Sequence, residues 1–79
     1  MTHNQTDPVR IADAERARNE AEDCGRLVAF TRQELGWTRA QLATAAELPE
    51  AEVAAFEEGR TYPVNPVLEH LLRTMGRTD

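Results

Sequence analysis

The side chains of residues 49–60, PEAEVAAFEEGR, include the charged groups most able to bind a partner, and most of these are acids. The stretch carries four glutamates, and its first basic residue is Arg60. An arginine guanidinium binds phosphate well, whereas a glutamate accepts hydrogen bonds from amino groups and repels anions. Arg60 can therefore bind an anion, while the glutamates before it favour a basic or amino-bearing partner.

The sequence offers no support for catalysis or metal binding. Cys24 is the single cysteine, and His3 and His70 lack neighbours at the spacing of zinc ligands. No nucleophile has a base beside it, and no glycine-rich phosphate loop is present. We expect no enzyme, no cofactor and no metal site, and we interpret Cys24 as a small buried hydrophobe and His70 as a solvated side chain.

Composition predicts one small acidic domain. The 79 residues bury a single modest core, and nine arginines, with no lysine, face fourteen acids for a net charge of −5. This charge opposes non-specific attraction to nucleic acid. No apolar run is long enough to span a membrane, and the opening residues lack the order of a signal peptide. We expect a cytoplasmic protein with no membrane partner.

In the N-terminal third of the chain, the sequence predicts a disordered lead at residues 1–7, followed by a helix. Asp7 before Pro8 is typical of a helix start, and residues 8–23 are rich in alanine, glutamate and arginine. Apolar side chains recur every three or four residues as a shallow seam: Ala14, Ala17, Ala21, Cys24 and Val28. This accessory helix, residues 8–23, either packs on its own domain or pairs with a second chain.

Gly25 is a candidate break after the accessory helix, because glycine costs about 1 kcal/mol inside a helix. Leu27 and Phe30 follow it, and we expect them to pack under the accessory helix and to supply most of its burial, with an interface for a protein partner as the alternative. The main domain is then expected to span residues 24–76.

The main domain carries start and stop signals for short helices. Gly36 suits a left-handed cap at a helix end, and Thr38 with Gln41 has the spacing of a capping box. Pro49 falls in the first turn of the next helix, and Gly59 stops it. These signals place two short helices one after the other.

A last helix is predicted after Asn65, which with Pro66 repeats the signal of a cap followed by proline. Its apolar residues fall on one face before Gly76 ends it: Leu68, Leu71, Leu72 and Met75. No segment alternates as a strand does. The predicted fold is all-α, a compact bundle of about five helices in which the accessory helix precedes the main domain.

The two short helices between Gly36 and Gly59 are joined by about four residues, the length of a tight helix-helix turn. Ala43 falls where these helices would cross, and a small side chain is needed there because a larger one would hold them apart. Apolar side chains occupy positions that suit a shared core: Leu42, Ala46, Leu48, Val53 and Phe56.

With these residues in place, the stretch WTRAQLATAAELPEAEVAAFEEGRTYP resembles the helix-turn-helix of Cro and the phage repressors, the Xre-type family. The resemblance covers about residues 24–75 and leaves the accessory helix outside. The matching positions are Leu42, Ala43, Leu48, Val53, Phe56, Glu57, Gly59 and Pro63. Each match is weak by itself, whereas the complete register is specific.

The resemblance implies a structural ion pair between Arg32 and Glu57, a pairing that suits the planar guanidinium. The sequence departs from the family at two positions. Glu47 stands where the family usually has glycine, so either a non-glycine residue is left-handed or the turn is reshaped. Arg39 replaces a glutamine that contacts phosphate in many relatives, and arginine preserves that capacity.

The resemblance also implies a DNA-contacting surface. Base edges would meet one side of the second short helix, where no side chain is a hydrogen-bond donor. The residues on this side are Pro49, Glu50, Ala51, Ala54, Ala55 and Glu58. Phosphate contacts would come mainly from Arg39 and Arg60. The candidate DNA-binding residues are Thr38, Arg39, Pro49, Glu50, Ala51, Ala54, Ala55 and Arg60.

Two functions remain open at this stage. The resemblance implies a sequence-specific transcriptional regulator of the Xre type that binds double-stranded DNA as a homodimer, so that two weak half-sites add. The acidic composition of residues 49–60 favours an alternative, in which the same fold binds a basic protein partner as an antirepressor or an accessory regulatory subunit.

Overall fold

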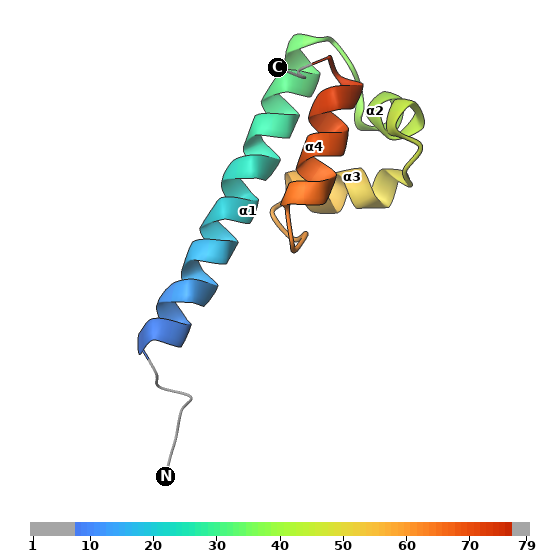
Figure 1. Cartoon of the computed structure of the whole chain (residues 1–79). Helices are drawn as coiled ribbons and strands as arrows, with labels where there is room; N and C mark the ends of the chain where they lie inside the picture. Colours follow the sequence, from blue (N-terminus) through green and yellow to red (C-terminus); the bar gives the residue numbers. More distant parts are fainter. Residues whose placement is uncertain (1–7, 77–79) are drawn as a thin grey trace.

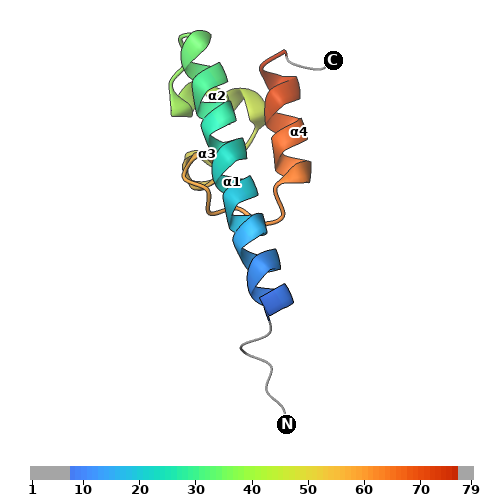
Figure 2. The same cartoon turned by 90° about the vertical axis from the view of Figure 1, so that its left-hand side faces the viewer.

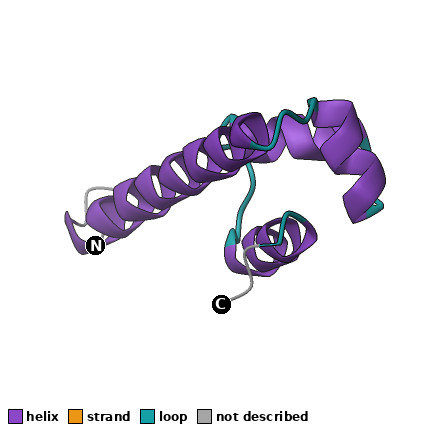
Figure 3. Ribbon diagram, turned by 90° about the horizontal axis from the view of Figure 1, so that it is seen from above, coloured by secondary structure: helices purple, strands orange, loops and turns teal. Residues whose placement is uncertain are grey.

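The regular structure is entirely helical in residues 8–76, the part of the chain that the computed structural model describes (Figure 1, Figure 3). The helices are α1 (Pro8–Glu34), α2 (Arg39–Ala46), α3 (Glu50–Glu57) and α4 (Asn65–Thr74). The all-α class is confirmed. The prediction of about five helices was wrong, because the accessory helix and the first helix of the main domain are one helix, α1. The expected lead at residues 1–7 lies outside the described residues.

Gly25 lies inside α1 and does not interrupt it. A Cβ atom built on Gly25 would lie 2.4 Å from the Phe56 carbonyl oxygen and 2.7 Å from the Glu57 carbonyl oxygen. Real Cβ atoms essentially never come this close to another heavy atom, so only glycine allows the two backbones to meet here. Gly25 is therefore the crossing point of α1 and α3, rather than the expected break.

The N-terminal half of α1 extends beyond the other helices (Figure 1, Figure 2). Ala14 and Ala17 are exposed, whereas Ala21 and Val28 are buried, so the predicted seam packs on its own domain only from Ala21 onward. Packing within the chain thus accounts for only part of the seam.

Leu27 and Phe30 were expected to pack under the N-terminal part of α1, but they do not. They are 41% and 57% exposed. At about 100° per residue, Phe30 points roughly 200° away from the buried Val28 and therefore away from the domain. The expectation failed because these two residues belong to the same straight helix as the seam and fall outside its buried side.

The core lies where α3 contacts α1 and α2, and where α4 contacts the same two helices. Phe56, Leu42, Leu71, Val28 and Val53 are the largest fully buried side chains. The predicted core residues are all present there: Leu42, Ala46, Val53 and Phe56 are buried, and Leu48 packs against them. Ala43 is 4% exposed, as the crossing of α2 and α3 requires.

Local signals define both ends of α2. Thr38 Oγ1 accepts from the Gln41 amide at 3.0 Å, and Gln41 Oε1 accepts from the Thr38 amide at 2.7 Å, which confirms the capping box. Glu47 is left-handed, with φ 60° and ψ 43°. Leu48 N–H still donates to the Ala43 carbonyl at 2.9 Å, so the turn keeps its shape at a cost of roughly 1 kcal/mol.

Two expectations for α4 need correction. Asn65 is the first residue of the helix and makes no side-chain cap, because Val64 occupies the preceding position. The ring of His70 is not merely solvated, since Nε2 lies 2.7 Å from the carbonyl oxygen of Ala46 at the end of α2. A histidine on α4 thus satisfies one of the unpaired carbonyls that every helix end leaves.

Candidate nucleic-acid interface

The helix-turn-helix consists of α2, the left-handed turn at Glu47 and α3. Packing through the buried side of α3 leaves Pro49, Glu50 and Ala51 exposed and Ala54 half-buried. Thr38 is exposed at the start of α2. The remaining candidates are Arg39 and Ala55, both half-buried, and Arg60, which is exposed just after α3. Every candidate residue therefore retains some accessible surface.

Arg32 and Glu57, the pair implied by the resemblance, form a two-point ion pair. The Arg32 Nε to Glu57 Oε2 distance is 2.6 Å, and the Nη2 to Oε1 distance is 3.1 Å. Their side chains are only 11% and 1% exposed. Arg32 Nη1 also donates to the carbonyl oxygen of Trp37 at 2.8 Å. This contact joins α1, the loop after it and α3.

Arg39 contributes a third group to this buried site, which the sequence did not predict. Its Nε donates to Glu57 Oε1 at 2.8 Å, and the side chain is 37% exposed. Arg39 lies 18 residues before Glu57, so no local spacing signals the contact. One buried carboxylate therefore holds two arginines, one from α1 and one from the first turn of α2.

The charges in this site shift two pKa values. Burial by itself raises the pKa of Glu57, but hydrogen bonds from Arg32 and Arg39, with their positive charges, outweigh burial and hold this pKa below its ordinary value. The hydrogen bond to Glu57 in turn raises the pKa of Arg39. Both groups are therefore charged at neutral pH.

Arg60, the second predicted phosphate donor, is paired with Glu58. Arg60 Nη2 lies 2.7 Å from Glu58 Oε1, and Nε lies 3.1 Å from the same oxygen. Glu58 Oε2 lies 3.6 Å from Arg39 Nη1. The hydrogen bond from Arg60 lowers the pKa of Glu58. Glu58, which the resemblance places toward base edges, has its carboxylate between the two arginines.

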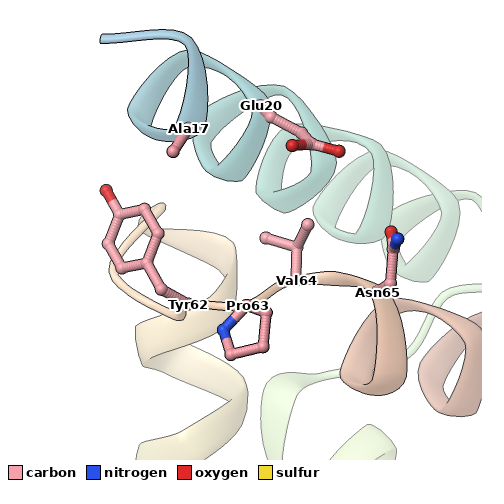
Figure 4. Close-up of a pocket in the computed structure, with 6 residues that line it drawn as sticks. All are labelled: Ala17, Glu20, Tyr62, Pro63, Val64 and Asn65. Carbon is pink, nitrogen blue, oxygen red and sulfur yellow. The ribbon is translucent and has the colours of Figure 1, made fainter. Parts of the chain in front are cut away.

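A groove of about 390 Å³ separates the protruding part of α1 from the loop before α4 (Figure 4). Its lining residues are Ala17, Glu20, Tyr62, Pro63, Val64 and Asn65. None of the candidate DNA-binding residues lines this groove, so it is separate from the interface. Within the described residues, no group of three or more His, Cys, Asp or Glu side chains is placed to hold a metal ion.

None of the helices in residues 8–76 combines the length and apolar character needed to cross a membrane. Comparison with protein families matches residues 23–79 to the family described as Helix-turn-helix domain, which agrees with the resemblance to the Xre type. Searches of curated proteins and of solved structures give no significant match. Helix-turn-helix domains are typically non-enzymatic. The match covers more than half of the chain, which therefore belongs to the helix-turn-helix domain family, and this membership indicates a DNA-binding regulator.

Proposed function

We propose that the chain is a sequence-specific transcriptional regulator of the Xre type, which binds double-stranded DNA as a homodimer. The observation that supports this most strongly is the accessible side of α3, with Glu50 and Ala51 exposed while Val53 and Phe56 fix the opposite side in the core. A helix held in this way can enter the major groove as a rigid unit.

In this proposal the side chains of α3 distinguish only weakly between DNA base pairs. Glu50 accepts from the amino group of cytosine, and Ala51 and Ala54 contact thymine methyl groups. Affinity comes mainly from the DNA backbone, through Arg39, Arg60 and the first-turn amides of α2. Binding is therefore weak per half-site and sensitive to salt, which is why a dimer is part of the proposal.

The direct test is retention of genomic DNA fragments from beside the gene, measured across a salt series. Sequence-selective retention that weakens with salt supports the regulator. A dimeric protein that retains no DNA even at low salt would contradict it.

Replacing Arg60 with alanine should weaken binding to all sequences alike and lower the salt slope by about one unit per site. Arg60 is the better choice than Arg39, because Arg39 also holds the buried Glu57. Fluorescence anisotropy with cognate and scrambled duplexes measures both quantities. Arg73→Ala is the matched control, since Arg73 is exposed on α4 and carries the same charge. An equal change in slope for both variants would argue against a contact by Arg60.

For the dimer, we propose an interface on the outer side of α1 that includes the exposed Leu27 and Phe30. Wild-type protein should then show twice the 8.9 kDa mass of one chain in sedimentation equilibrium, and Phe30→Glu should show a single-chain mass. Burying a new charge in an apolar contact is costly, which is the reason for the expected dissociation. Thr44→Glu places the same charge at an exposed position of α2, outside the outer side of α1, and should leave the dimer intact. A monomeric wild-type protein would refute this part of the proposal.

A second candidate function, binding of a basic protein partner, is favoured by one observation. Glu50 and Glu52 are exposed in the first turn of α3, while the neighbouring arginines, Arg39 and Arg60, already pair with glutamates. The exposed charge of α3 is therefore mainly negative. Retention of DNA decides between the two functions, because an α3 used only for protein contact predicts none.

A further inference from the structure

The carboxylate of Glu58 lies between Arg39, the first residue of α2, and Arg60, which follows α3. Its Oε1 accepts from Arg60 Nη2 at 2.7 Å, and its Oε2 lies 3.6 Å from Arg39 Nη1. The side chains of Arg39, Glu58 and Arg60 are 37%, 47% and 63% exposed. A ligand from solvent can therefore reach all three groups.

We propose that Arg39 and Arg60 form a phosphate-binding site which Glu58 occupies in the free protein, so that a DNA phosphate must displace the Glu58 carboxylate. This inference rests on the proposed DNA-binding function and adds a competitor to it. A carboxylate and a phosphate offer the same kind of oxygen acceptors to the guanidinium fork, so one replaces the other without a new binding geometry.

Glu57 makes the site rigid on one side. It accepts from Arg39 Nε at 2.8 Å and is itself buried, so Arg39 stays in position when Glu58 leaves. The edge of Arg39 that carries Nη1 faces Glu58. Phosphate thus meets Arg39, which Glu57 keeps in place, and the more exposed Arg60, whose contacts with Glu58 are released when Glu58 leaves.

Glu58 differs from Glu57 because its ion pairs are exposed and can be removed without loss of the fold. Exposed ion pairs contribute little to folding, so the fold does not depend on Glu58. Removing its charge weakens the contacts of Glu58 with Arg60 and with Arg39 Nη1, and also removes a negative charge from the interface. Glu58→Gln should therefore bind DNA about tenfold more tightly, the change expected for releasing two exposed ion pairs.

The test compares Glu58→Gln with Glu52→Gln in fluorescence anisotropy titrations with duplex DNA. Glu52 is exposed on α3, which ends one residue before Glu58, and its substitution removes the same charge. The proposal expects a clearly larger gain for Glu58→Gln, and expects Arg60→Ala in the Glu58→Gln background to abolish most of that excess. Equal gains in affinity for the two glutamine variants would mean that each removes only general repulsion of DNA. This result would overturn the proposal that Glu58 competes with phosphate.

A second measurement separates this inference from the function on which it rests. The side-chain Nε–H signals of Arg39 and Arg60 are followed by NMR during titration with inorganic phosphate, without DNA. In Glu58→Gln both signals should shift at several-fold lower phosphate concentration than in wild type. Shifts of this kind in a protein that retains no DNA would support the phosphate site and refute the regulator. Identical phosphate responses in both proteins would refute the phosphate site, whatever happens with DNA.

Discussion

Replacing Glu57 with glutamine should lower the free energy of unfolding by about 3–5 kcal/mol, because it leaves Arg32 and Arg39 without their shared carboxylate. The side chain of Glu57 is 1% exposed, so water cannot take its place as a partner. Domains of this size have a total stability of roughly 5–15 kcal/mol. The loss should therefore appear as a fall in melting temperature of roughly 12 °C or more.

Glu58→Gln is the matched control for this prediction. It makes the same chemical change one residue later, at a carboxylate that also contacts Arg39 but is 47% exposed. Thermal unfolding followed by circular dichroism should show a large shift for Glu57→Gln and little shift for Glu58→Gln. Melting temperatures within about 3 °C of wild type for both variants, below the shift for 1 kcal/mol, would exclude a stabilising role of the buried pair.

The same carboxylate predicts how stability depends on pH. Its pKa in the folded chain is lowered from an ordinary value of 4.5 by the two arginines, so folding favours the charged form. The stabilisation is fully present above pH 4.5 and is lost as the pH falls through the lowered pKa. The stability difference between wild type and Glu57→Gln should therefore shrink on acidification below about pH 4.5. A constant difference down to pH 2 would contradict the direction of the shift.

Replacing Gly25 with alanine should destabilise the fold by about 2 kcal/mol, which is an overpacking cost of about 3 kcal/mol less the gain in helix propensity. Propensity by itself favours alanine by about 1 kcal/mol. The added Cβ would however lie 2.4 Å from the Phe56 carbonyl oxygen and 2.9 Å from the Glu57 carbonyl carbon. These are backbone atoms, so α1 and α3 must move apart and loosen the core between them.

Because the two effects have opposite signs, the measurement decides clearly between them. Urea unfolding gives the free energies of wild type, Gly25→Ala and the control Asn19→Ala, which lies on an exposed part of α1. The control should be neutral or slightly stabilised. A stabilised Gly25→Ala would show that α1 and α3 do not approach each other as closely as the structure places them.

The sequence by itself determined the elements whose causes are local. The capping box of Thr38 and Gln41 begins α2, and the small side chain of Ala43 permits the crossing with α3. The positions of Leu42, Val53 and Phe56 along their helices were enough to identify the core. Each of these signals acts over a few residues, through hydrogen bonds or helical periodicity, so its spacing in the chain carries the information.

Only the tertiary structure decided how the charged residues of the interface are partnered. The spacing of two residues between Glu58 and Arg60 could have suggested their ion pair, but the spacing of 18 residues between Arg39 and Glu57 could not. The folding of α2 and α3 against α1 brings these groups together. The predicted phosphate donors are therefore already held by carboxylates in the free chain.

Gly25 and Phe30 illustrate the same limit for packing. Gly25 has the sequence signature of a helix break, yet its missing Cβ serves a contact with residues of α3 far along the chain. Phe30 has the signature of a core residue, yet it is 57% exposed. Which side of a helix meets another backbone depends on the path of the whole chain, because side-chain direction in α1 is set relative to α3 and α4. Composition and local spacing do not determine that path. The close contact of Gly25 and the exposure of Phe30 therefore became known only from the tertiary structure.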